Sequence, residues 1–371
     1  MISHPWRAVV CLAIVLGGSA AGAQEERRVD LHGFGTWAYG NTDANNYLSG
    51  TPVGRYRNAE FLLNASTTVS ERLRIVAQTG VRDEGAGPEV DLDFAFAEWR
   101  FSDRIKMRAG VVPQPFGIST ELFDVGTLRP FLVLPQAVYG SVGLTSEAYW
   151  GVGFTGSVPL VQSWHLAYDV YGGGTVLEEF HAPEHFLEGE PVSSEEGHGD
   201  ETTNDVIGAR IVFETPLAGL RFGGSAQTGN ELGEGRRSIA AVQVEYLTDK
   251  WSARTEYGHE SVADELRLDG FYAEVAYRID PRWQVAGQYG RLTTDLPAVA
   301  VTAGRSLLTH EELAVGLNYW FHHAFVCKLS YHRVEGNRLA APDAEDLAAL
   351  VASGGLRTKT NLVAFGVQFS F

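Results

Sequence analysis

Cysteine and long apolar runs are scarce in this chain, and each scarcity excludes a class of protein. Only two of the 371 residues are cysteines, Cys11 and Cys327. Cys11 lies in the predicted signal peptide, so only Cys327 remains in the mature chain, and one cysteine builds neither a disulfide framework nor a thiolate metal cluster. After Ala23, no stretch approaches the roughly 18 consecutive apolar residues of a membrane-spanning helix. The sequence therefore excludes a disulfide-stapled domain and a helical membrane protein.

Basic residues are fewer than acidic residues in this chain. The chain has 29 lysines and arginines against 46 aspartates and glutamates, which gives a formal net charge of −17. Proteins that bind nucleic acid neutralise phosphates with basic side chains. The acidic balance therefore argues against a nucleic-acid partner.

The first 23 residues have the pattern of a secretory signal peptide. Arg7 stands before an apolar stretch, Ala8 to Leu16, and small residues follow, ending Ala21-Gly22-Ala23. A basic start, a short apolar centre and an A-x-A site predict cleavage after Ala23. The apolar centre falls far short of the roughly 20 residues that a membrane span needs. Residues 24–371 would then form the mature protein.

Turns of two contrasting lengths alternate along the mature chain. Seven breaks have two to four residues, and each separates two runs of alternating apolar and polar residues. They are Ser70-Glu71-Arg72, Ser102-Asp103-Arg104, Pro159 to Gln162, Pro216 to Gly219, Thr248-Asp249-Lys250, Asp280-Pro281-Arg282 and His322-His323-Ala324. Longer polar connections lie between these hairpins. This rhythm is typical of an up-and-down barrel that crosses an outer membrane.

Sixteen runs have strand character, and most are near the 9–11 residues of a tilted spanning strand. They are Val29–Gly40, Asn58–Val69, Leu73–Arg82, Val90–Phe101, Ile105–Val112, Trp150–Val158, Ser163–Gly172, Asp205–Glu214, Leu220–Gly229, Ser238–Leu247, Trp251–Ser261, Leu268–Ile279, Trp283–Leu292, Leu307–Phe321, Phe325–Val334 and Lys359–Phe371. An even number places both chain ends on the short-turn side. The sequence predicts an all-β fold: a transmembrane antiparallel up-and-down β-barrel of about 16 strands, with short periplasmic turns and long extracellular loops. A soluble β-sandwich is the alternative, although it would not sort its loops so strictly by length.

Aromatic residues recur in register on three of these runs. Trp251, Trp283 and Phe325 follow short turns, and Tyr257, Tyr289 and Tyr331 lie six residues further on. An even offset places both members of a pair on one face, which fits the two interfacial aromatic belts of a barrel. The opposite face is polar, and it includes Arg254, Gln284 and Lys328. A polar inner face on about 16 strands predicts an aqueous channel.

With this pattern of strands and turns, the chain resembles the general porins of Gram-negative bacteria over essentially its whole mature length. The ending Val367-Gln368-Phe369-Ser370-Phe371 looks like their assembly signal, with Phe369 and Phe371 as its aromatic residues, which the barrel-assembly machinery reads. The stretch from Ala97-Glu98-Trp99-Arg100-Phe101 through Arg108-Ala109-Gly110 to Pro115-Phe116-Gly117 is similar to the phosphate-selective porin O/P group. The resemblance implies an outer-membrane homotrimer, among lipid and lipopolysaccharide, through which small solutes and ions diffuse passively.

The third long connection, Pro113 to Tyr149, is unusually apolar. It contains Phe116, Leu122, Phe123 and the run Phe131-Leu132-Val133-Leu134. We expect this segment, called the third loop below, to fold into the barrel, as the third loop of general porins does. A surface loop that packs on itself is the alternative. The third loop has no dense run of lysines and arginines, which argues against phosphate selectivity.

Charged residues on and beside this loop are the candidate pore constriction. The loop carries Glu121 and Asp124, and alternation places Arg74 and Arg108 in the lumen. We hypothesise that these four side chains face one another across the narrowest part, because rings of charge set ion preference in a narrow opening. Three further basic residues are predicted as lumen charges: Arg82, Arg100 and Lys106.

The segment Thr175 to Thr203 contains nine acidic residues and no lysine or arginine. It also contains His181, His185 and His198, so a divalent-cation site is conceivable. The spacing matches no defined metal motif, and the segment is interpreted as a solvated extracellular loop. We expect neither a metal site nor a cofactor.

Three other functions remain as alternatives. A substrate-specific channel for phosphate or another anion, an organic acid or an oligosaccharide differs from a general porin only in its lumen. An enzyme would need a nucleophile joined to a base, and no recognisable motif joins serine to histidine, so we expect none. A purely structural or adhesive barrel is also possible.

Overall fold

The computed structural model describes residues 28–56, 58–83, 87–118, 125–140, 144, 146–180, 198–231, 235–263, 266–296, 305–342 and 344–371. The predicted signal peptide, residues 1–23, lies outside the described residues and stays a prediction. Among the described residues, no helix is long and apolar enough to cross a membrane.

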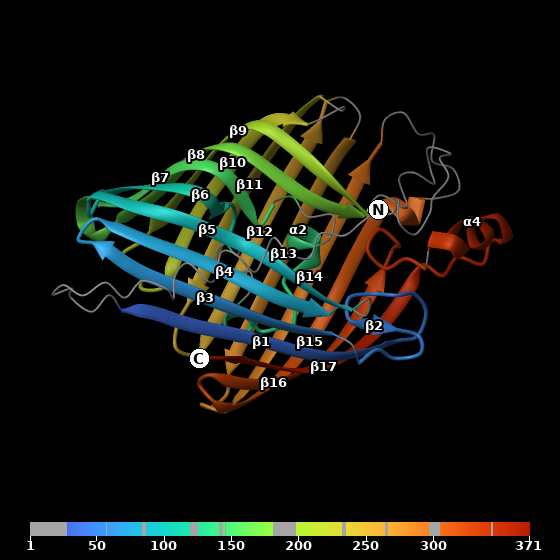
Figure 1. Ribbon diagram of the computed structural model, residues 1–371. Helices are drawn as coiled ribbons and strands as arrows, with labels where there is room; N and C mark the ends of the chain where they lie inside the picture. Colours follow the sequence, from blue (N-terminus) through green and yellow to red (C-terminus); the bar gives the residue numbers. More distant parts are fainter. Residues whose placement is uncertain are drawn as a thin grey trace.

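Sixteen long antiparallel strands form a closed barrel in the described chain (Figure 1). They are β1 (Val29–Thr42), β3 (Ala59–Ser70), β4 (Leu73–Asp83), β5 (Pro88–Ser102), β6 (Ile105–Pro113), β7 (Ala148–Pro159), β8 (His165–Phe180), β9 (His198–Glu214), β10 (Leu220–Glu231), β11 (Gly235–Leu247), β12 (Trp251–Val262), β13 (Leu266–Arg278), β14 (Trp283–Asp295), β15 (Thr309–His322), β16 (Phe325–Glu335) and β17 (Lys359–Ser370). Each strand pairs with its neighbours in sequence, and β1 pairs with β17 to close the barrel. The predicted fold class is therefore confirmed, as is every predicted short turn.

Two predicted boundaries are wrong. We expected strands to end at Gly172 and to resume at Asp205, but β8 and β9 stay paired as far as Phe180 and His198. A shift in register between Gly173 and Thr175 absorbs the irregularity there. Backbone pairing continues because a ladder needs no particular side chains. The flanks of the acidic segment are thus strand, and residues 181–197 lie outside the described part.

Six short elements of the described chain were not predicted: five lie in the long loops, and η3 lies in the short turn between β7 and β8. They are β2 (Gly50–Thr51), η2 (Gly126–Leu128), α2 (Gln136–Tyr139), η3 (Val161–Ser163), η4 (Arg305–Leu308) and α4 (Ala344–Ser353). Figure 1 shows α4 projecting beyond one end of the barrel, and α2 among the strands. The C-terminus lies at the opposite end from α4.

The outer face of the barrel is apolar and aromatic, as alternation predicts. Trp251 and Trp283 are 47% and 40% exposed, and Tyr257 and Tyr331 are similarly exposed. Trp251 packs on Tyr277 of the next strand. Cys327 lies on this outer face, between outward-facing Phe325 and exposed Leu329. Large exposed apolar side chains all around a sheet suit a lipid surround rather than water.

The inner face is polar, and its charges pair across neighbouring strands. Arg254 donates to Glu245 at 2.7 Å and to Glu274 at 3.4 Å, and Glu245 also pairs with Arg221. This row joins β10, β11, β12 and β13 at one height. Buried charges require such partners because desolvation is costly.

The C-terminal residues close the barrel against β1. Phe371 exchanges two backbone hydrogen bonds with Gly33, at 3.0 and 2.9 Å. The rings of Phe371 and Phe369 lie over Gly33 and Gly35, where any Cβ would collide with them. The ring of Phe371 also stacks on Phe61 of β3, with centroids 6.3 Å apart. Aromatic side chains that cover glycines on a neighbouring strand stabilise sheet pairing.

Candidate functional site

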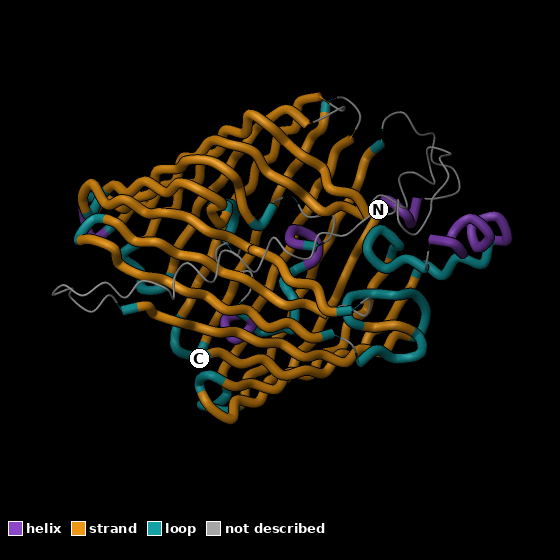
Figure 2. Tube along the Cα trace, viewed as in Figure 1, coloured by secondary structure: helices purple, strands orange, loops and turns teal. Residues whose placement is uncertain are grey.

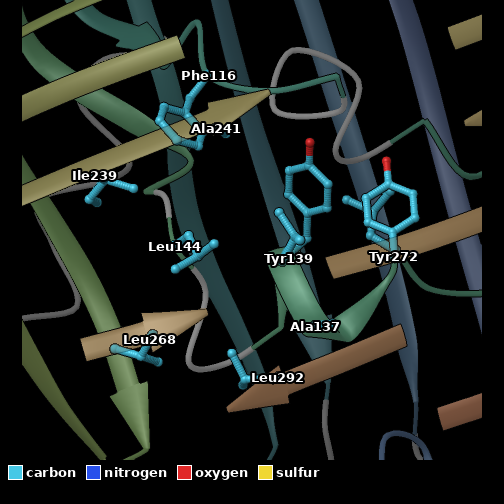
Figure 3. Close-up of a cluster of buried hydrophobic side chains, with 11 residues drawn as sticks. Phe116, Ala137, Tyr139, Leu144, Ile239, Ala241, Leu268, Tyr272 and Leu292 are labelled. Atoms are coloured by element: carbon cyan, nitrogen blue, oxygen red, sulfur yellow. The ribbon is translucent and has the colours of Figure 1, made fainter. Parts of the chain in front are cut away.

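The third loop lies inside the barrel along much of its described length. Figure 2 shows its helical turns within the ring of strands. Two clusters of apolar side chains hold the third loop inside the barrel. Phe116, Val138 and Leu144 pack with Ile239 and Leu268 of the wall, and Figure 3 shows much of this cluster around α2. Leu132 joins a second cluster with Ala38, Val334 and Leu362.

Buried Lys328 of β16 is the main polar anchor of this loop. Its Nζ donates to the carbonyl oxygens of Gly126, Arg129 and Phe131 at 2.8, 2.6 and 3.0 Å. An ammonium has three protons, and these three acceptors account for all of them. Two amides flank the anchor: Asn318 donates to the carbonyl of Pro130, and Gln368 donates to that of Leu132.

Glu256 of β12 anchors the start of the loop and α2. Tyr139 donates from its hydroxyl to Glu256 Oε2 at 2.5 Å, and the Ile118 N–H donates to the Tyr139 hydroxyl at 2.9 Å. Gly117 lies beside them with φ +60, and a Cβ there would collide with Glu256 and Tyr139. Only glycine fits both the backbone conformation and the space.

The anchoring contacts lie on one side of the barrel. They run from Tyr171 of β8 and Gln227 of β10, both contacting the loop residue Gln114, round to β17 and β1. Among the described residues, the inner faces of β3 and β4 lie outside the two apolar clusters. On β5 and β6, Phe96 and Val112 pack against Tyr149 at the end of the loop. A passage beside the loop would therefore run along these four strands.

The predicted lumen bases lie on the wall formed by β4, β5 and β6. Arg74, Glu98 and Arg108 stand opposite one another on β4, β5 and β6 in one cross-strand row. Arg108 pairs with Glu98 at 2.9 Å, and Lys106 lies 3.6 Å from the same carboxylate. Arg74 donates to Ser66 Oγ at 2.9 Å, and no acidic side chain in the described chain forms an ion pair with it.

The other two predicted lumen charges lie at opposite ends of the wall. Arg82 is at the long-loop end, where it pairs with Glu60 at 2.7 Å and Asp93 at 2.8 Å. Arg100 is next to the short turns, half-exposed and 3.8 Å from Asp103. The five bases therefore do not form one ring. The acids of the hypothesis, Glu121 and Asp124, lie outside the described residues, and their facing of Arg74 and Arg108 stays a prediction.

Sequence reasoning missed two aromatic side chains on the same wall. Phe94 and Phe96 of β5 both point inward, and their ring centroids are 6.0 Å apart. The guanidinium carbon of Arg108 lies 5.5 Å from the centre of the Phe96 ring. The signal for them lies in the sequence, because even spacing places Phe94 and Phe96 on the same face as Glu98 and Arg100.

A second missed feature is a row of Ser330, His332 and Glu312. Ser330 Oγ lies 2.7 Å from His332 Nε2, and His332 Nδ1 lies 2.6 Å from Glu312 Oε1. This order of groups is that of a hydrolase triad. However, Ser330 is buried beneath the loop, with Phe131 against the His332 ring. The neighbouring strand amides are engaged in the sheet and cannot form an oxyanion hole.

Metal binding has no support in the described residues, where no group of three or more histidine, cysteine or acidic side chains could hold an ion. Most of the acidic segment Thr175 to Thr203 lies outside them, so its conceivable cation site stays a hypothesis.

No protein-family model matches the sequence, and no curated protein matches it. Solved outer-membrane proteins share its fold. OmpF of Salmonella typhi, in a complex with daunomycin, has a TM-score of 0.58 at 12% identity, over 93% of this chain and 98% of that one. The outer membrane channel DcaP of Acinetobacter baumannii has a TM-score of 0.58 at 10% identity, over 95% and 100%. The trimer form of OmpT from Vibrio cholerae has a TM-score of 0.56 at 10% identity, over 94% and 100%.

Proposed function

We propose that this protein is a channel in the outer membrane of a Gram-negative bacterium, through which small hydrophilic solutes and ions diffuse passively. The observation that carries the proposal is the position of the third loop. It is anchored to one side of a wide barrel and leaves a charged wall on β3, β4, β5 and β6. A polar wall inside a lipid-facing barrel suits an aqueous path. The shared fold of solved outer-membrane channels supports the same conclusion.

The proposed surroundings follow from this role. A cleaved signal peptide would deliver the chain to the periplasm, and the barrel-assembly machinery would insert it among lipid and lipopolysaccharide. A homotrimer is the proposed assembly, and the trimer form of OmpT supports it. We propose no enzymatic activity, because the Ser330 row is covered. Liposome swelling with sugars of graded size tests the open channel, and an unchanged vesicle volume would contradict it.

A channel selective for anions is the second candidate. Among the described residues, Arg74, Lys106 and Arg108 lie around the carboxylate of Glu98, so the described part of this wall is basic. Phosphate selectivity of the porin O/P type would need a denser basic constriction than the described residues provide.

Neutralising the basic row is expected to shift ion preference toward cations. In Arg74→Gln with Arg108→Gln, the wall loses two positive charges, and Glu98 keeps only Lys106 near it among the described residues. Two unit charges 4 Å apart interact with about 1 kcal/mol in water. We therefore expect roughly a five-fold change in the ratio of cation to anion permeability. Neutralising Glu121 and Asp124 should shift the ion preference toward anions. The reversal potential of single channels in a salt gradient measures the ion preference of both double variants.

The matched control is Glu195→Gln with Glu196→Gln in the acidic segment. Charges beyond roughly 8 Å are screened at physiological salt, so this change should have much less effect. If the control moved the reversal potential more than the wall variants did, the basic row and the two loop acids would not form the constriction.

A further inference from the structure

Two phenylalanine rings lie on the inner face of the wall formed by β3, β4, β5 and β6. Phe94 and Phe96 are each partly exposed, although they lie on the inner face. Phe96 packs on one side against the buried cluster of Val112, Tyr149 and Tyr171. Apolar surface left toward water is unfavourable, and it is covered favourably by an apolar part of a solute.

A β-bulge places these rings beside a charge. The pairing of Gln78 with Phe94 and of Thr79 with Leu92 leaves Asp93 as an extra residue in β5. The extra residue lets Asp93 reach Arg82 while Phe94 and Phe96 keep their inward positions. Asp93 is thereby turned toward Arg82, on the long-loop side of the rings.

Cations lie on the short-turn side of the rings. The Arg108 guanidinium lies against Phe96 and reaches Glu98, which Lys106 also approaches. Arg74 occupies the same row and donates to a neutral serine. In the described part of the wall, three cationic groups therefore lie around Glu98, next to an aromatic pair.

Acidic side chains lie on the long-loop side of the rings. Glu60, Asp91 and Asp93 surround Arg82 at distances of 2.7 to 3.8 Å. Along this wall the order from long loops to short turns is acidic, aromatic and basic. A ligand with an aromatic ring and one anionic end matches the aromatic and basic parts of this wall.

We propose that Phe94, Phe96, Arg74 and Arg108 form a binding site for aromatic carboxylates inside the pore. The ring of the solute stacks on Phe94 and Phe96, and its carboxylate takes hydrogen bonds from guanidinium groups. The site rests on the proposed channel function and gives that channel a preferred class of solute.

Benzoate is the probe, and acetate is the matched anion without a ring. The full-length protein is reconstituted in a planar bilayer, and the channel is first established by its conductance in potassium chloride. Benzoate is then expected to reduce that current at a concentration about ten-fold below that of acetate, the ratio that one stacking contact supplies. Block should be asymmetric between the two sides, because acids guard one side of the rings and bases the other.

Two variants and a control separate the parts of the site. Phe94→Leu with Phe96→Leu keeps apolar volume and is expected to abolish the difference between benzoate and acetate. Arg74→Gln with Arg108→Gln should weaken block by both anions. Phe271→Leu, which changes an aromatic residue on the outer face, should change neither.

Equal block by benzoate and acetate in the wild-type channel would overturn the proposal. So would stronger block by benzylammonium, which would make the site one for aromatic cations. A protein without conductance in potassium chloride would instead contradict the proposed function, and the binding site would fall with it.

Discussion

Replacing Lys328 with methionine is expected to release the third loop and raise the single-channel conductance. The Lys328 ammonium satisfies the carbonyls of Gly126, Arg129 and Phe131 while fully buried. Methionine fills a similar volume but donates no hydrogen bond, and each abandoned buried carbonyl costs about 1–3 kcal/mol unless water reaches it. The loop regains those hydrogen bonds by moving into the aqueous lumen, so its segment 126–132 should detach from β16.

Single-channel recording measures the effect as a larger and noisier current, and protease cleavage within the loop gives an independent readout. Lys359→Met is the control, because Lys359 is exposed and pairs with Glu335 at the rim. Asn318→Ala removes one flanking hydrogen bond, to Pro130, and should give a smaller change in the same direction. A folded Lys328→Met channel with wild-type conductance and the same protease resistance would show that the apolar clusters alone hold the loop.

The alternation of residues was enough to predict most of the barrel. Trp251 with Tyr257, and Trp283 with Tyr289, needed only an even spacing to be placed on the outer face. Short turns such as Thr248 to Lys250 and Asp280 to Arg282 mark where one strand ends and the next begins, and so allow the strands to be counted. Both signals are local, because a strand turns its side chains to alternate faces wherever it lies in the sheet.

The lumen could be predicted only in part, because its contacts are far apart in sequence. Alternation places Lys328 inside, but it cannot say that a loop some 200 residues earlier covers it. The bulge at Asp93 depends on the register between β4 and β5, which neither strand specifies alone. Arg82 and Arg74 share a face, as expected. Their partners differ, because Arg82 pairs with acidic side chains and Arg74 donates to a serine. The acidic and basic ends of the wall can therefore be distinguished only in the folded structure.

Deleting Phe371 is expected to prevent most of the chain from reaching its closed, membrane-inserted form. The residue supplies the two backbone hydrogen bonds to Gly33, together worth about 2 kcal/mol, and a ring that covers Gly33 and stacks on Phe61. These contacts join the last strand to the first, so their loss weakens the seam on which closure depends. An open barrel would leave strand edges unpaired in lipid, where unsatisfied backbone groups are costly. Outer-membrane yield and heat-modifiable gel mobility measure the outcome.

Two further variants distinguish a recognition signal from a packing contact. Phe321→Ala removes an outward aromatic residue that is as exposed as Phe371, 63% in each case, and leaves the seam intact. It should assemble normally. Gly33→Val keeps the C-terminus unchanged but forces the Phe371 ring away from β1. If the seam contact matters, this variant assembles poorly as well. Normal yield of Gly33→Val beside failure of the Phe371 deletion would assign the effect to recognition of the C-terminus alone, and normal yield of the deletion itself would remove both explanations.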